Sequence, residues 1–146
     1  MTSRILLIED DKNLGDQIVT HLKRDGFEVT WIQDGHAALD ADPKQHDLVV
    51  LDLMLPGAHG LDILKVYRET AETPVLVLSA RNETSTKVRA LALGADDVAD
   101  VPALEGLVGR AQRLALQEQL DCAAAVLQLH EAGLAHHALG QHASGD

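Results

Sequence analysis

Hydrophobic and polar positions follow two alternating periods along the chain, which predicts strands and helices in turn. The segments 4–8 and 48–51 are almost continuously apolar, as is typical of strands buried on both faces of a parallel sheet. Between them, apolar residues recur at helical spacing from Leu14 to Leu22. Strand and helix alternate five times, so the predicted fold class is α/β, a doubly wound five-stranded parallel sheet with helices on both faces. We expect the strands at about 4–8, 27–32, 48–51, 75–78 and 98–101.

Cap and turn residues mark where the predicted helices begin and end. Asn13 precedes the first helical pattern, and we expect it to be the N-cap. Asp25-Gly26 and Gly94 are expected to end the first and fourth helices, because glycine readily takes the left-handed conformation that follows a helix. The second helix should lie around 37–39, the third at about 60–71 and the fourth at about 84–93.

The C-terminal part differs in composition. From Leu104 to Leu139 the sequence has no proline and is rich in alanine, leucine and glutamine, which are good helix formers. We expect a fifth helix to begin near Ala103 and to extend beyond Leu116. The expected organisation is a domain of residues 1–116 followed by a helical extension of residues 117–146.

Charge and cysteine content narrow the function classes. The chain has 12 basic and 23 acidic residues, a net charge of −11, which argues against direct binding of nucleic acid and against docking on an anionic membrane. The apolar runs are too short to span a bilayer, and the N-terminus leads directly into a strand rather than a signal peptide. The single cysteine, Cys122, cannot form an internal disulfide, so we expect a cytoplasmic protein.

Polar residues follow three of the predicted strands. Glu9 and Asp10 follow the first, Asp52 the third and Ser79 the fourth, so all should lie at the carboxyl edge of the sheet. Clustered carboxylates repel one another unless a cation joins them, and a few hard oxygen ligands favour Mg²⁺. Such a site could neutralise phosphoryl oxygens beside Asp52 as a carboxylate nucleophile. Ser79 could donate a hydrogen bond to the same oxygens, and the small Ala80 would leave the approach open.

Four segments together resemble a known family. They read Ile-Leu-Leu-Ile-Glu-Asp-Asp, Val-Val-Leu-Asp-Leu-Met-Leu-Pro-Gly, Val-Leu-Val-Leu-Ser-Ala-Arg and Leu-Gly-Ala-Asp-Asp. At this spacing the chain resembles the receiver domain of bacterial two-component response regulators, most of all the subfamily whose receivers precede a winged-helix DNA-binding domain. The resemblance implies a flavodoxin-like strand order of 2-1-3-4-5.

The resemblance also implies a role for each residue of the acidic group. Asp52 would be the phosphoacceptor, taking a phosphoryl group from a sensor histidine kinase or a phosphotransfer protein. Asp10 and Asp52 would bind Mg²⁺ directly, Glu9 through water, and Met54 through its backbone carbonyl. Ser79 matches the hydroxyl position that reports phosphorylation in the family.

Two departures from the family leave two functions open. The family has a lysine before the proline that follows the fifth strand, whereas this chain has Val101, and the expected aromatic residue on that strand is Val98. No output domain is expected after the receiver, because the remaining segment is short and acidic. The intact acidic group favours a stand-alone receiver that accepts a phosphoryl group on Asp52. The two valines favour an atypical receiver that acts as a phosphorylation-independent dimerisation or interaction module.

Two surfaces could support a homodimer. Five charged residues match positions that pair across dimers in the resembled subfamily, although a solvated charged face is an equal alternative. The later apolar positions of the C-terminal segment form a stripe with no sheet left to cover, which favours a homodimer, unless this segment folds back or frays. The predicted dimer residues are Lys87, Arg89, Asp96, Asp97 and Arg110 on the domain and Leu120, Leu127 and Leu134 on the extension.

Overall fold

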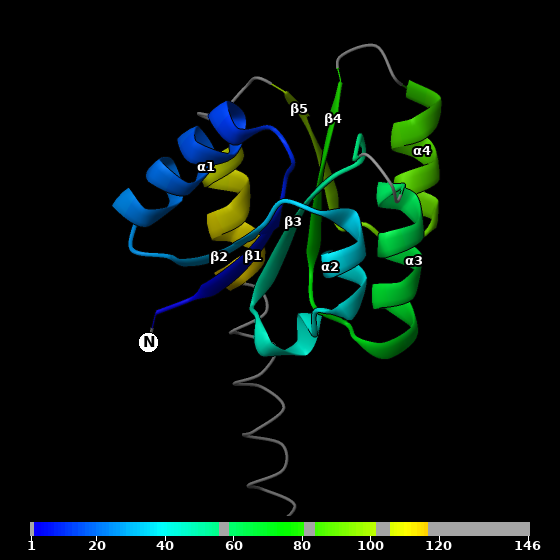
Figure 1. The fold of residues 1–146 in the computed structure, drawn as a ribbon, viewed down its shortest axis with the longest axis horizontal. Helices are drawn as coiled ribbons and strands as arrows, with labels where there is room; N and C mark the ends of the chain where they lie inside the picture. Colours follow the sequence, from blue (N-terminus) through cyan, green and yellow to red (C-terminus); the bar gives the residue numbers. More distant parts are fainter. Residues whose placement is uncertain (1, 56–58, 81–83, 102–105, 117–146) are drawn as a thin grey trace, which may run out of the picture.

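The computed structural model describes residues 2–55, 59–80, 84–101 and 106–116 (Figure 1). Strands and helices alternate along these residues as the sequence predicts. The strands are β1 (Arg4–Ile8), β2 (Glu28–Ile32), β3 (Leu48–Asp52), β4 (Val75–Ala80) and β5 (Asp97–Val101). The helices are α1 (Lys12–Arg24), α2 (Gly35–Asp40), the 3₁₀ turn Pro43–Gln45, α3 (Gly60–Thr70) and α4 (Thr84–Ala92), followed by a helix over residues 106–116.

The strands form one parallel sheet in the order β2-β1-β3-β4-β5, which confirms the flavodoxin-like topology. Strand order reverses beside β1, because β2 lies on one side of it and β3 on the other. In sheets of this kind the carboxyl ends on either side of the reversal border a crevice that takes ligands. The ends of β1 and β3 are therefore the place where a site is expected.

Helices cover both faces of the sheet (Figure 1). The helices α1 and 106–116 lie on one face, and α2, α3 and α4 lie on the other. Each face has its own core, because side chains of a buried strand alternate between the two sides. Leu6, Val49 and Val77 belong to the core under α2 and α3, whereas Leu7 and Val50 belong to the core under α1. All five side chains are fully buried, as the apolar runs predict.

The N-terminus of α1 differs from the prediction. Asp11, and not Asn13, is the N-cap: its Oδ1 accepts hydrogen bonds from the backbone N–H groups of Asn13 and Leu14 at 2.9 and 3.1 Å. The helix therefore begins at Lys12, immediately after the acidic turn that ends β1. Asparagine and aspartate cap helices about equally well, so sequence preference alone does not choose between them.

Three strands are longer than predicted, β5 by one residue at Asp97, and the extensions of β3 and β4 carry site residues. Asp52 is the last residue of β3, and β4 continues through Ser79 to Ala80. The ladder continues because β5 offers partners, with Ser79 paired to Asp100 and Ala80 paired to Val101. The ends of α1 and α4 agree with prediction, since Gly26 and Gly94 have φ values of 89° and 113°.

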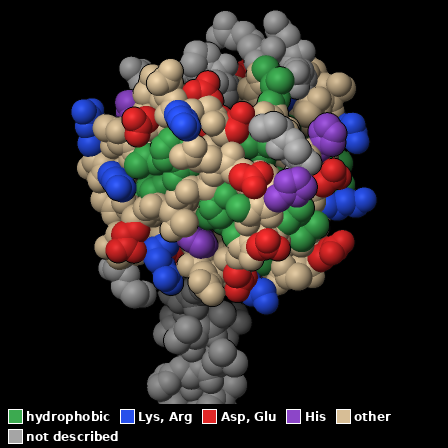
Figure 2. Space-filling model, in the orientation of Figure 1, with side chains coloured by type: hydrophobic (Ala, Val, Ile, Leu, Met, Phe, Trp, Pro, Cys, Tyr) green, Lys and Arg blue, Asp and Glu red, His purple; other side chains and the backbone are tan. Residues whose placement is uncertain are grey.

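The predicted C-terminal extension, residues 117–146, lies outside the described residues, as does the expected helix start near Ala103. Of the predicted dimer stripe, Leu120, Leu127 and Leu134 fall in this part and stay predictions. Among the described helices, none has both the length and the apolar character needed to cross a bilayer. On the face seen in Figure 2, acidic and basic side chains are interspersed, with small groups of hydrophobic atoms between them.

Candidate functional site

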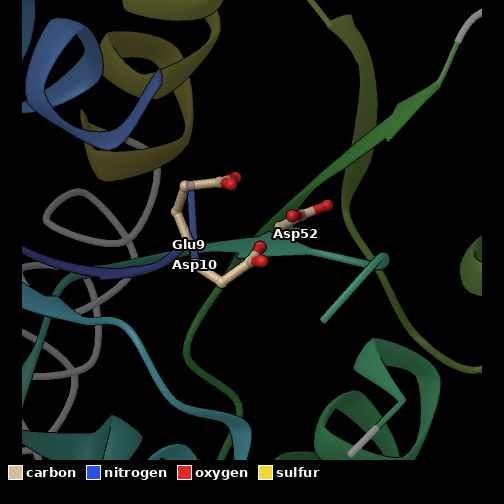
Figure 3. Close-up of side chains that lie close together, drawn as sticks. All are labelled: Glu9, Asp10 and Asp52. Atoms are coloured by element: carbon tan, nitrogen blue, oxygen red, sulfur yellow. The ribbon is translucent and has the colours of Figure 1, made fainter. Parts of the chain in front are cut away.

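The acidic residues predicted at the ends of two strands meet at the carboxyl edge of the sheet (Figure 3). Glu9 and Asp10 follow β1, and Asp52 ends β3, the neighbouring strand. One carboxylate oxygen from each of these residues lies within 4.8 Å of the other two. The register between β1 and β3 brings them together, because Ile8 pairs with Leu51, the residue before Asp52.

The site is an open pocket of about 300 Å³. Every residue that the sequence predicted for the phosphoryl and metal site lines it, together with two further residues. The lining residues are Glu9, Asp10, Asp11, Leu14, Asp52, Met54, Ser79 and Ala80. The side chain of Met54 is 60% exposed, so it borders the pocket from the solvent side.

Backbone hydrogen bonds orient the carboxylates of Glu9 and Asp52, and each bond uses only one of the two carboxylate oxygens. The backbone N–H of Asp11 donates to Glu9 Oε1 at 3.1 Å, and the N–H of Met54 donates to Asp52 Oδ1 at 3.0 Å. Glu9 is 1% exposed, and its Oε2 atom has no hydrogen-bond partner among the described residues. A buried oxygen without a partner is costly, so this atom is suited to a ligand that brings positive charge or a donor.

The pKa values of two pocket carboxyl groups are raised, as is expected when carboxyl groups lie together in a partly buried site. Burial, together with the negative charge of Asp52, raises the pKa of Glu9 from an ordinary 4.5 to about 8. Burial also raises the pKa of Asp52, opposed by the hydrogen bond from Met54. No lysine or arginine is among the described residues that line the pocket. Three carboxylates with a buried free oxygen fit a hard divalent cation such as Mg²⁺.

Ser79 brings a hydroxyl group to the same pocket. Its side chain is 1% exposed, and Oγ has no hydrogen-bond partner among the described residues. The neighbouring strand offers none at Val98, whose apolar side chain packs with the core under α3. The hydroxyl is therefore available to a ligand. Ala80, beside it, pairs through its backbone with Val101, which places position 101 next to the pocket wall.

Comparison with known proteins identifies this arrangement. Residues 5–103 match the family model of the response regulator receiver domain. The chain belongs to this family. As a receiver domain, it carries its acidic pocket where β1 and β3 end, and the resemblance seen in the four sequence segments is confirmed.

Three similar proteins illustrate the relationship. The sensory transduction protein RegX3 of Mycobacterium tuberculosis (strain ATCC 25618 / H37Rv) is 44% identical over 103 residues, covering 70% of this chain and 45% of RegX3. The transcriptional regulatory protein QseB of Escherichia coli O157:H7 is 48% identical over 96 residues, covering 64% of this chain and 44% of QseB. The BeF3-activated receiver domain of DrrB, from Thermotoga maritima, is 30% identical with a TM-score of 0.71, covering 78% of this chain and 97% of that domain. This receiver chain thus spans less than half the length of the curated relatives.

Sequence reasoning missed three residues that shape the pocket of this receiver. Asp11 lines it and caps α1. Gly60 allows α3 to begin against β3, because a Cβ there would lie 2.6 Å from the carbonyl oxygen of Asp52. Trp31 donates a hydrogen bond from Nε1 to the carbonyl oxygen of Glu9 at 2.8 Å. The acidic run after the first strand could have indicated Asp11, but nothing in the sequence relates Trp31 to Glu9.

The charged residues predicted for a dimer face make contacts within this receiver. Asp96 pairs with Arg68 at 2.8 Å and also accepts from the backbone N–H of Val75. Arg110 lies 3.6 Å from Asp97 and donates to the carbonyl of Val98. Two further contacts complete the set: Lys87 pairs with Asp100, and Arg89 lines a separate cavity between α3 and α4. Their pairing across a dimer stays a prediction.

Proposed function

We propose that this receiver accepts a phosphoryl group on Asp52 from a phosphohistidine of a sensor histidine kinase or a phosphotransfer protein. One observation carries the proposal. The Asp52 carboxylate lies in an open pocket beside two further carboxylates, Glu9 and Asp10, and a buried serine hydroxyl that has no hydrogen-bond partner among the described residues. A nucleophile, groups suited to a divalent cation and a hydrogen-bond donor are therefore all within one site.

The transfer is a single displacement at phosphorus. A carboxylate oxygen of Asp52 attacks the phosphorus atom, a P–O bond forms, and the P–N bond to the imidazole breaks. The leaving nitrogen keeps the electron pair of that bond, and the product on this chain is an acyl phosphate. Attack by water on the same phosphorus would later restore the carboxylate and release inorganic phosphate, as slow self-dephosphorylation.

The residues of the pocket have different roles in this transfer. Asp10 and Asp52 would hold Mg²⁺ directly, Glu9 through water, and Met54 through its backbone carbonyl. When bound, Mg²⁺ neutralises charge on the phosphoryl oxygens. Ser79 donates its hydroxyl proton as a hydrogen bond to a phosphoryl oxygen, and Ala80 leaves room for that oxygen beside the strand end.

The expected partners follow from the same chemistry and from charge. The group on the kinase side is a phosphorylated imidazole, so the partner is a protein that presents its histidine at the carboxyl edge of the sheet. A net charge of −11 gives this chain no basic footprint for direct contact with nucleic acid. We place the reaction in the cytoplasm, because a chain with one cysteine, Cys122, is typical of a reducing compartment.

A second candidate function is a receiver that dimerises or binds partners without phosphorylation. Position 101 lies beside the pocket through the pairing of Ala80 with Val101, and valine supplies no ammonium for a phosphoryl group. The described lining residues supply no other cation. Within the described part of the pocket, only a bound Mg²⁺ would offset the charge of an acyl phosphate, which favours weak phosphorylation or altered switching.

Mass spectrometry of the intact protein separates the two functions. Incubation with acetyl phosphate and Mg²⁺ should give wild type a single phosphoryl adduct that neutral hydroxylamine removes. Asp52→Asn should give none, because the amide is not a nucleophile of this kind. Asp16→Asn, a matched change at an exposed carboxylate of α1, should behave as wild type. An adduct that persists in Asp52→Asn contradicts the assignment, and no adduct in wild type favours the second function.

A further inference from the structure

The carbonyl group of Glu9 lies where the β1–β2 ladder ends. The last register pair of these strands is Ile8 with Ile32, and the N–H of Glu9 still donates to the Ile32 carbonyl at 3.1 Å. The carbonyl oxygen of Glu9 instead accepts from the indole Nε1 of Trp31 at 2.8 Å. The Trp31 side chain thus supplies a hydrogen bond at the position where the backbone ladder ends. Glu9 is 1% exposed, so without this bond its carbonyl oxygen would lack a partner from water.

This carbonyl belongs to the peptide that joins two pocket carboxylates. Because a peptide is planar, holding its oxygen fixes the orientation of the plane between the Cα atoms of Glu9 and Asp10. A rotation of that plane would move both side chains relative to Asp52. The remaining anchor on this turn is the hydrogen bond from the Asp11 N–H to Glu9 Oε1, which depends on the same geometry.

Gly15 makes this arrangement possible. It is buried in the first turns of α1, and its N–H donates to the carbonyl of Asp11, the residue that caps the helix. A Cβ at Gly15 would lie 2.1 Å from Cζ2 of the Trp31 ring and within 2.8 Å of two further ring atoms. The ring therefore lies flat against a helix position that only glycine can occupy without displacing it.

We propose that Trp31, seated on Gly15, is a positioning residue for the metal-binding carboxylates of Glu9 and Asp10. The indole connects β2 to the acidic turn and the start of α1, a segment that is distant in the sequence but lies beside β2 in the fold. Its N–H sets the orientation of the Glu9–Asp10 peptide before any ion binds. The identity of the ion, Mg²⁺, rests on the proposed function, whereas the placement of the turn does not.

Hydrogen exchange in the metal-free, full-length protein tests the placement directly. Trp31→Phe keeps an aromatic ring and removes the N–H donor. The amide of Asp11, which donates to Glu9, should exchange faster in this variant. The amide of Leu53, which donates to the carbonyl of Leu78 on the far side of the pocket, should exchange as in wild type. This contrast separates a local change of the turn from a general loss of stability.

Calorimetric titration with Mg²⁺ tests the consequence for binding. Loss of an outer-shell partner typically weakens metal affinity by about tenfold or more, and we expect about a tenfold loss in Trp31→Phe. Phe27→Leu is the matched control, because Phe27 packs on the same core cluster as Trp31 and makes no described contact with the acidic turn. Its Mg²⁺ affinity should equal that of wild type.

Each outcome decides the proposal. Unchanged exchange at Asp11 in Trp31→Phe would overturn the proposal. Faster exchange with an unchanged Mg²⁺ affinity would also overturn it, because Trp31 would then hold the turn without positioning the carboxylates for the ion. Equal losses of affinity in Trp31→Phe and Phe27→Leu would also overturn it. If wild type binds no Mg²⁺, the proposed function fails, while exchange at Asp11 still decides whether Trp31 holds the turn.

Discussion

Glu9 lies in an environment very different from that of a free side chain in water. It is 1% exposed, lies beside Asp52 and Asp10, and has a pKa raised to about 8, mainly by burial. The folded state therefore binds a proton on the Glu9 carboxyl group more tightly than the unfolded state does. This preference stabilises the folded state fully below pH 4.5, and the stabilisation is lost as the pH rises through about 8. A cation in the pocket would reverse this effect by favouring the ionised form.

We therefore expect wild-type protein without metal to lose thermal stability relative to Glu9→Gln as the pH rises from about 5 to 8, since the amide cannot ionise. Added Mg²⁺ should recover the loss in wild type, and more so at the higher pH. Differential scanning fluorimetry in chelated buffers measures both effects. Parallel pH profiles of the two proteins would show that Glu9 is not the residue that titrates.

At the scale of elements, α1 depends on a cap that also belongs to the pocket. Asp11 accepts two backbone hydrogen bonds from the first turn of α1, while Asn13, the cap expected from sequence, donates one of them. The pocket wall and the start of the helix are thus the same short segment. A change at Asp11 should weaken the helix and the site together.

Asp11→Ala should cost about 1 kcal/mol of the free energy of unfolding, the usual effect of losing an N-cap side chain. Asn13→Ala is the matched control, and it should be nearly neutral because only its backbone N–H takes part in the cap. Urea denaturation followed by circular dichroism compares the two. A larger loss in Asn13→Ala than in Asp11→Ala would contradict the cap assignment.

At the scale of the whole molecule, two surfaces compete as a dimer interface. The exposed side of α4 presents Val88 and Leu91, which are 59% and 50% exposed. The C-terminal segment, outside the described residues, carries Leu120, Leu127 and Leu134 at seven-residue spacing, which is typical of helices that pair. Four of the five charged residues near α4 and β5, namely Lys87, Asp96, Asp97 and Arg110, already form ion pairs within the chain, which favours the C-terminal segment.

We predict a homodimer that forms through the C-terminal segment without phosphorylation. Leu127→Lys in the full chain should be monomeric, because a charge replaces an apolar residue in the middle of the stripe. Val88→Lys, the same change on α4, should dimerise as wild type does. Light scattering over a concentration series decides: the reverse result would assign the interface to α4, and a monomeric wild type would rule out both.

The sequence by itself determined the fold and the location of the site. Continuous apolar runs such as 48–51 are typical of strands buried on both faces, and parallel strands bring their carboxyl ends to one edge. Glu9, Asp52 and Ser79 were therefore predicted to meet, although they are far apart in the chain, and they line one pocket. The hydrophobic period and the direction of the strands predict the fold class and the edge that carries the site, whereas the strand order was predicted from the resemblance to receiver domains.

Three features of the site depend on how the strands and helices pack together, and only the tertiary structure showed them. Trp31 lies 22 positions from Glu9, and its contact with the Glu9 carbonyl arises from β1–β2 register and the space above Gly15. The choice of Asp11 over Asn13 as cap follows from where β1 ends, since the two residue types have similar capping preferences. The raised pKa of Glu9 follows from burial and from negative charges that the fold brings together. Neither the burial nor the distance between these charges can be read from the residue type or from the hydrophobic period.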